Sequence, residues 1–174
     1  LPPRPDADDI PLSFCDESRI DEAFSPTGAL GSMYPDYEER QEQLGMAHEV
    51  AACLREGDIR VIEAGTGVGK SMAYLVPVAF AAHENKVTMG VATKTNALMD
   101  QLVYHELPRL NSVLGQDLSY IALKGYDHYL CLRKLEHMAR TDQGDNCDVI
   151  SMIATLLNFT AQTSHGDLDA LNIS

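Results

Sequence analysis

The sequence has 174 residues, which is long enough for one domain with a hydrophobic core, and a formal net charge of −13. This acidic balance argues against a strong nucleic-acid binder acting alone, although residues 1–42 carry −8 of the charge and the remainder does not exclude a DNA partner. Four cysteines lie far apart without a C-x-x-C pair, which argues against a disulfide framework or a zinc site and favours a reducing cytoplasm.

The start of the chain carries few structural signals. Because the sequence begins at Leu1 rather than at a methionine, we expect an excerpt of a longer protein. It opens on prolines and acidic residues instead of a secretory signal. The longest apolar run, residues 72–82, is too short to span a membrane and contains Pro77, so no membrane partner is expected. Residues 1–18 are proline-rich and acidic, which predicts a linker or a disordered arm.

Helical spacing then alternates with short β-branched runs. The spacing predicts one helix at 18–24, capped by Ser18, and another at 39–56, ended by Gly57. Further helices are predicted up to about residue 83 and at 93–109, 129–140 and 149–162, with an acidic turn around Gly144. Strands are predicted at 59–63, 86–92 and 119–123. This alternation predicts an α/β fold, with a parallel sheet covered by helices on both faces.

A glycine-rich stretch follows the first predicted strand and opens the next predicted helix. It reads A-x-x-G-x-G-K-S from Ala64, which replaces the first glycine of the usual phosphate-loop pattern. Gly67 and Gly69 let main-chain N–H groups approach phosphate oxygens, Lys70 adds a positive charge, and Ser71 supplies a hydroxyl for Mg²⁺. The stretch predicts binding of ATP or GTP by a loop formed by Ala64, Gly65, Thr66, Gly67, Val68 and Gly69. The alternative is a plain glycine turn with an incidental lysine.

Four further motifs occur in a fixed order along the chain. They are YEERQEQ at 37–43, VATKTNALMDQL at 91–102, LKGYDHYLC at 123–131 and GDLDAL at 166–171. Together with the phosphate loop, they resemble the N-terminal part of the first motor domain of DinG/XPD-type superfamily 2 DNA helicases. The resemblance covers about residues 20–171 and is nearer to the bacterial DinG branch.

The resemblance implies an incomplete RecA-like P-loop domain in three segments. These are a linker at 1–18, the N-terminal part of motor domain 1 at 19–123 and the truncated start of an iron–sulfur insertion at 124–174. It also implies an ATP-dependent 5′→3′ DNA helicase that uses Mg²⁺, binds single-stranded and duplex DNA, and acts in repair or recombination. The implied location is the bacterial cytoplasm, at the nucleoid. The oligomeric state stays open, with a monomer favoured.

The first motif matches the family element that recognises the nucleoside. The resemblance implies that the Gln43 amide selects adenine, because an amide can both donate to and accept from the edge of the base. Tyr37 would then stack on the base, and Arg40 would brace the pocket. The alternative is a charged first helical turn that needs no ligand.

The second motif matches the family element that contacts the DNA backbone. Small hydroxyls and main-chain N–H groups between a strand and a helix suit the phosphates of single-stranded DNA. The resemblance therefore implies DNA contacts by Thr93, Lys94, Thr95 and Gln101. The alternative is an ordinary helix cap by Thr93 or Thr95.

The third motif ends on Cys131. In the iron–sulfur members of the family, the matching cysteine is the first of four thiolate ligands of a [4Fe–4S] cluster, which the resemblance extends to Cys131. Only Cys147 follows, as an expected helix-terminal cysteine, so the other ligands would lie beyond Ser174 and the cluster is expected only in the full-length protein. The alternative is a cysteine buried for packing.

These features favour a piece of a helicase. In the complete enzyme Lys70 and the Mg²⁺ held by Ser71 would offset charge that develops as water attacks the γ-phosphate. The chain lacks the acidic box and the second motor domain of the family, so this piece alone is expected to be inactive. Two alternatives stay open. One is a degenerate, non-motor scaffold module that binds nucleotide, and the other is an unrelated P-loop kinase.

Overall fold

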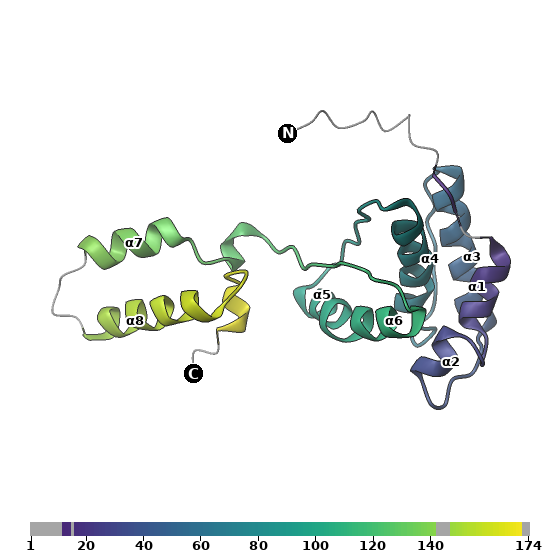
Figure 1. Cartoon of the computed structure of the whole chain (residues 1–174), viewed down its shortest axis with the longest axis horizontal. Helices are drawn as coiled ribbons and strands as arrows, with labels where there is room; N and C mark the ends of the chain where they lie inside the picture. The colour runs from purple at the N-terminus through teal and green to yellow at the C-terminus, as the bar shows by residue number, and fades with distance from the viewer. Residues whose placement is uncertain (1–11, 15, 142–146, 172–174) are drawn as a thin grey trace. The chain divides into compact units, whose positions relative to one another are not determined.

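The computed structural model describes residues 12–14, 16–141 and 147–171. The described residues are mainly helical, and the chain divides into two compact units, one up to Ala122 and one from Leu123 onward (Figure 1). In the first unit the helical elements are α1 (Glu17–Phe24), α2 (Ala29–Met33), α3 (Gln41–Glu56), α4 (Lys70–Asn85), α5 (Asn96–Gln101), the π-helical turn η2 (Leu102–Glu106) and α6 (Leu107–Leu114).

Local side chains and a glycine set the ends of the first helices. Asp16, and not the predicted Ser18, caps α1, because its carboxylate accepts the Arg19 N–H at 3.1 Å. The Ser18 hydroxyl instead donates to the same carboxylate. Gly57 ends α3 in the left-handed conformation, with φ 68°, so the predicted end of this helix is confirmed.

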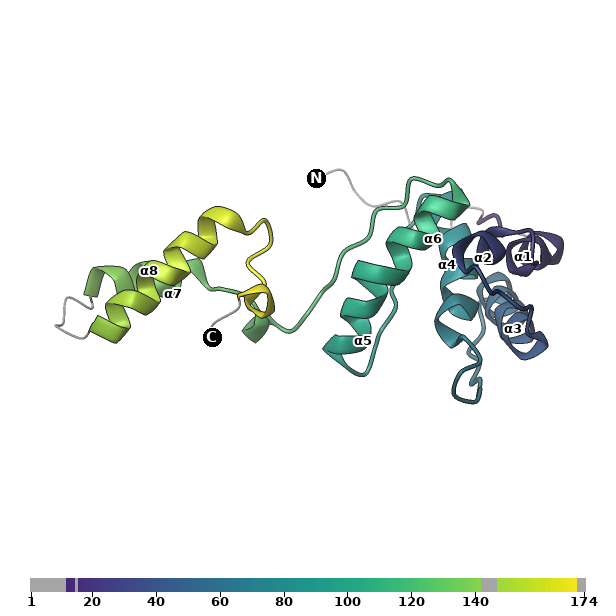
Figure 2. The ribbon, with the colours of Figure 1, turned by 90° about the horizontal axis from the view of Figure 1, so that it is seen from below.

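The core of the first unit forms between helices. Helices α3 and α4 pack against each other, α1 lies against both, and α2 packs against α6 (Figure 1, Figure 2). The largest fully buried side chains come from α1, α2, α4 and α6, and are Phe24, Ile20, Leu30, Leu110, Val76 and Pro77. Because α4 begins at Lys70, this packing anchors one end of the glycine-rich stretch.

The second unit is built on a helical pair. Helix α7 (Leu132–Thr141) packs against α8 (Cys147–Gln162), and Leu135, Ile153 and Phe159 are buried. The 3₁₀ turns η3 (Tyr126–His128) and η4 (Leu168–Ala170) lie on either side of this pair in the sequence. An isolated antiparallel bridge joins Tyr129 to Asp167, so segments near the two ends of the unit meet.

The predicted parallel sheet is wrong. The described residues contain no strand, and the Tyr129–Asp167 bridge is the single β-type pairing among them. The runs at 59–63, 86–92 and 119–123 have the β-branched composition of strands, but a strand also needs neighbouring backbone with which to pair. Their apolar side chains stay outside the core: Ile59 is 97% exposed and Val61 98%. The glycine-rich stretch therefore has the expected helix after it but no strand before it.

The helices predicted from spacing are largely confirmed. Predicted helix 39–56 is α3, and the helix predicted to end near residue 83 is α4, which continues to Asn85 with Pro77 inside it. The helix predicted at 93–109 is divided into α5, η2 and α6. Among the described residues no helix is long and apolar enough to cross a membrane. Residues 1–11 and 15 of the predicted linker, and the turn around Gly144, lie outside the described residues.

Candidate functional site

The glycine-rich stretch forms a turn whose shape requires glycine. Gly67 and Gly69 have φ angles of 80° and 86°, in the left-handed region that residues with a Cβ rarely adopt. Gly69 is also the N-cap residue of α4, so the unpaired N–H groups and the positive dipole end of a 16-residue helix lie directly after the turn. These features together suit an anion.

The Lys70 ammonium is directed back at its own loop. Its Nζ donates to the Ala64 carbonyl at 3.0 Å and to the Gly65 carbonyl at 2.6 Å. The charge therefore lies over the start of the turn, where two main-chain oxygens hold it.

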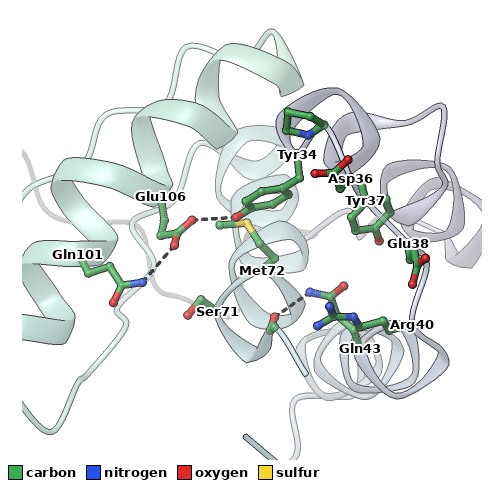
Figure 3. A pocket seen from close by; sticks show the side chains of 12 residues that line it. Tyr34, Asp36, Tyr37, Glu38, Arg40, Gln43, Ser71, Met72, Gln101 and Glu106 are labelled. Carbon is green, nitrogen blue, oxygen red and sulfur yellow. Dashed lines mark hydrogen bonds between the residues drawn. The ribbon is translucent and has the colours of Figure 1, made fainter. Parts of the chain in front are cut away.

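A pocket of about 500 Å³ opens beside this loop (Figure 3). That volume is in the range of small-molecule sites in proteins. Three regions supply its lining: the segment before α3 together with the first turn of α3, the start of α4, and the region around η2. The lining residues are Tyr34, Pro35, Asp36, Tyr37, Glu38, Arg40, Gln43, Gly69, Ser71, Met72, Gln101 and Glu106.

Two residues of the predicted nucleoside element bond directly to the glycine loop. The Gln43 side chain is 5% exposed, and its Nε2 donates to the Gly69 carbonyl at 2.9 Å. The Arg40 guanidinium donates to the Gly67 carbonyl. Residues that lie 26 and 27 positions apart in the sequence are therefore joined on one wall of the pocket.

Tyr37 lines the same pocket, with its hydroxyl anchored away from the loop. The hydroxyl donates to the Phe24 carbonyl at 2.8 Å, and burial, followed by the nearby Glu39 carboxylate, raises the pKa of Tyr37. The phenol therefore stays neutral, and the ring is held at the pocket by this hydrogen bond.

A second wall is formed by three side chains that hydrogen-bond to one another. The Tyr34 hydroxyl donates to Glu106 Oε2 at 3.1 Å, and Gln101 Nε2 donates to Glu106 Oε1 at 3.2 Å (Figure 3). Burial and the adjacent Glu106 carboxylate raise the pKa of Tyr34 to about 12. Tyr34 is therefore the donor and Glu106 the acceptor of this pair.

The other residues of the predicted DNA element lie at the start of α5. The Thr95 hydroxyl accepts the Leu98 N–H at 3.2 Å, and the Thr93 hydroxyl donates to the Thr95 carbonyl at 3.0 Å. The cap by Thr95 is therefore present, and Lys94 is exposed beside it. Of the four residues predicted to contact DNA, Gln101 lines the pocket and the other three do not.

In the second unit a buried lysine joins the third and fourth motifs. The Lys124 side chain is 2% exposed, and its Nζ lies 2.8 Å from Asp167 Oδ2 and 2.9 Å from Asp169 Oδ2. Close by, the Leu130 N–H donates to the Gly166 carbonyl at 2.8 Å. The Lys124 ammonium, followed by His128, lowers the pKa of Asp169. We call Lys124, Asp167 and Asp169 the lysine clamp.

Cys131 follows this region and is exposed, so the alternative of a cysteine buried for packing is wrong. Cys147 is the first residue of α8 and is also exposed, as expected for a helix-terminal position. Among the described residues no group of three or more His, Cys, Asp or Glu side chains is placed to hold a metal ion.

Comparison with known proteins identifies the relatives of this chain. No protein-family model matches it. It is 34% identical over 145 residues to the "3'-5' exonuclease DinG" of Bacillus subtilis and, over the same length, 34% identical to the "ATP-dependent DNA helicase YoaA" of Escherichia coli. Each match covers 83% of this chain. It is also 39% identical over 116 residues, 66% of the chain, to the "ATP-dependent DNA helicase DinG" of Escherichia coli. The chain is a relative of the DinG-type helicases.

The chain spans only part of the length of those proteins. It corresponds to 16% of the length of each of the two DinG proteins and 22% of the length of YoaA. The sequence identities to these proteins confirm the resemblance found in the motifs.

Several residues of the pocket could not be predicted from the sequence. Tyr34 and Glu106 face each other from segments 72 positions apart, so no local pattern connects them. Met72 follows directly after the predicted motif and resembles any other buried helix residue. Pro108 is the one local signal near Glu106, because a proline inside a helical pattern marks a disturbed turn.

Proposed function

We propose that this chain is part of an ATP-dependent DNA helicase, in which it supplies the ATP-binding loop and one of the surfaces that contact DNA. The activity of the complete protein is inferred from the named relatives, because the chain covers less than a quarter of their length. Translocation from 5′ to 3′ and a role in repair or recombination belong to the same proposal.

The observation that carries the proposal is the junction between Gln43, Arg40 and the glycine loop. A buried amide is satisfied when it is hydrogen-bonded, and Gln43 meets this need on the Gly69 carbonyl while lining the pocket. A glutamine at this place has its amide beside both the phosphate loop and a space of nucleoside size. This arrangement supports selection of adenine by Gln43, with Tyr37 as the stacking ring.

The loop itself fits a triphosphate. Its left-handed glycines, the N-terminus of α4 and the Lys70 ammonium are the donors that phosphate oxygens require. In the proposed bound state Lys70 leaves the Ala64 and Gly65 carbonyls and donates to the phosphates. When bound, ATP would supply the phosphoryl group and Mg²⁺ would offset the charge of its phosphates, and Ser71 is the residue that would hold the ion.

Segment 93–101 supports a DNA-facing role. Lys94 is an exposed cation beside the capped start of α5, where positive charge and N–H groups suit phosphates. We propose that Thr93, Lys94 and Thr95 contact the backbone of single-stranded DNA. The four thiolates of an iron–sulfur cluster are not supplied by the described residues, so Cys131 would be one ligand among others that lie outside them.

The test is Lys70→Ala in the intact protein. We expect the variant to lose DNA-stimulated ATP hydrolysis and unwinding while its circular dichroism and its binding of single-stranded DNA stay as in the wild type. Lys134→Ala, which removes an exposed lysine of α7, is the matched control. Unwinding retained in Lys70→Ala would reject the loop as the motor site. A wild type that binds Mg–ATP without hydrolysing it would instead favour a non-motor scaffold.

A further inference from the structure

The helical segment at the end of the predicted DNA element contains a turn that is wider than an α-helical turn. The Leu107 N–H bonds to the Leu102 carbonyl, five residues back, which makes Leu102–Glu106 a π-helical turn between α5 and α6. In a regular α-helix, side chains five residues apart point about 140° away from each other. The extra residue of a π turn removes most of this difference. Gln101 and Glu106 therefore lie on one face, and their side chains meet at 3.2 Å.

Pro108 supplies the reason for the wide turn. A proline inside an α-helix has no N–H to donate, and its ring presses on the carbonyl four residues earlier, here that of Tyr104. A π turn directly before the proline gives this carbonyl room. Wide turns of this kind occur frequently at functional sites. Pro108 therefore favours the wide turn that places Glu106 at the pocket.

Both oxygens of the Glu106 carboxylate are taken by donors from different parts of the first unit. Gln101 donates from the end of α5, and Tyr34 donates from the residue after α2 (Figure 3). Tyr34 stands three residues before Tyr37 in the segment that leads to Gln43. The three bonded side chains therefore connect the end of the predicted DNA element to the segment that carries the predicted nucleoside residues.

We propose that Glu106 is a positioning residue that couples DNA binding at segment 93–101 to nucleotide binding in the pocket, through Gln101 on one side and Tyr34 on the other. This inference rests on the proposed function. The Glu106 carboxylate and a DNA phosphate compete for the side-chain amide of Gln101, because this amide can donate to either of them. An approaching phosphate also repels the Glu106 carboxylate.

A shift of Glu106 is transmitted to the nucleotide pocket. Because the Tyr34 hydroxyl donates to the Glu106 carboxylate, Tyr34 moves when this carboxylate moves. Both residues line the pocket together with Ser71. Linkage between two binding sites is reciprocal, so bound nucleotide must change DNA affinity by the same factor that bound DNA changes nucleotide affinity.

The experiment measures this factor in the intact protein. The dissociation constant of a non-hydrolysable Mg–ATP analogue is determined with and without saturating oligothymidylate, and the ratio of the two constants is the coupling factor. Tyr34→Phe removes one hydroxyl and its bond to Glu106, while Glu106→Gln removes the charge and keeps the shape. Tyr104→Phe is the matched control, because it removes an exposed tyrosine hydroxyl of η2 that does not line the pocket.

We expect a coupling factor of about 5 or more in the wild type and in Tyr104→Phe. In Tyr34→Phe and Glu106→Gln the factor should fall to within about twofold of one, with both ligands still bound. Unchanged coupling in both of these variants would overturn the inference and leave the proposed function standing. An equal loss in Tyr104→Phe would also overturn it, since the effect would then not depend on the hydrogen bonds to Glu106. A wild type that binds neither nucleotide nor DNA would overturn the proposed function itself.

Discussion

Replacing Gly69 with alanine should separate two properties of the glycine loop, its left-handed backbone and its contact with Gln43. Gly69 has φ 86°, and an added Cβ would lie 2.2 Å from Gln43 Nε2. Real Cβ atoms do not approach other heavy atoms so closely, so the Gln43 amide must move away. The substitution therefore strains the loop and also displaces the residue proposed to select adenine.

The magnitude follows from these two effects. A left-handed conformation costs a residue with a Cβ about 1–2 kcal/mol. Loss of the hydrogen bond from Gln43 to the Gly69 carbonyl adds about 1 kcal/mol. If the loop must keep its shape to bind phosphate, the total of about 2–3 kcal/mol appears as weaker Mg–ATP binding, by about 30- to 150-fold.

Two other glycines provide matched controls. Gly67→Ala introduces the same kind of strain, at φ 80°, but an added Cβ meets no atom within 4 Å, so we expect a loss of only about 5- to 30-fold. Gly45 lies exposed inside α3, where an added Cβ also meets nothing. Gly45→Ala should stabilise the protein by about 0.5–1 kcal/mol and leave Mg–ATP affinity unchanged.

The assay is isothermal titration calorimetry with Mg–ATP on the intact protein, accompanied by thermal unfolding of each variant. A folded Gly69→Ala protein that binds Mg–ATP within about threefold of the wild type would refute the requirement for a left-handed loop. Equal losses in Gly67→Ala and Gly69→Ala would retain the strain argument and reject the part assigned to Gln43.

Three further predictions concern stability. Lys124→Met leaves the Asp167 and Asp169 carboxylates without their cation and should destabilise the second unit, read as loss of hydrogen-exchange protection at the Leu130 N–H. Because folding lowers the pKa of Asp169, the stability that it contributes is present above the unfolded-state pKa and lost as pH falls through the lower folded value. Protection of Leu130, corrected for intrinsic exchange, should therefore hold at neutral pH and decline only below about pH 4. Leu110→Ala empties a fully buried site and should cost about 3 kcal/mol, seen as a lower Tm than that of the exposed control Leu157→Ala.

The sequence predicts helices well where a local cause sets their ends. The helix at 39–56 differs from α3 by two residues, because an apolar face recurs at helical spacing and Gly57 can adopt the left-handed conformation. The helix after the glycine loop is predicted for similar reasons. The cap of α1 was assigned to the wrong residue, since Asp16 and Ser18 are both competent N-caps and the sequence does not rank them.

The predicted sheet failed for a different reason. A helix closes its hydrogen bonds within one segment, whereas a strand depends on partners that lie elsewhere in the chain. The β-branched runs at 59–63, 86–92 and 119–123 favour an extended backbone, but among the described residues none of them pairs with another strand. Composition alone could not reveal this, because β propensity largely measures fit to a surface formed by neighbouring strands.

Each of the two units contains one junction that the order of the motifs does not reveal. Gln43 reaches Gly69 across 26 positions, and Lys124 reaches Asp169 across 45. In both junctions a buried polar side chain of one motif forms its hydrogen bond with a residue of another motif. Leaving such a group without a hydrogen bond costs more free energy than the bond itself contributes to stability. Each of these residues is therefore constrained twice, by its own motif and by its distant partner. A substitution on one side should be tolerated only when the other side changes with it. The Lys124→Met and Gly69→Ala variants test this requirement in the two units separately.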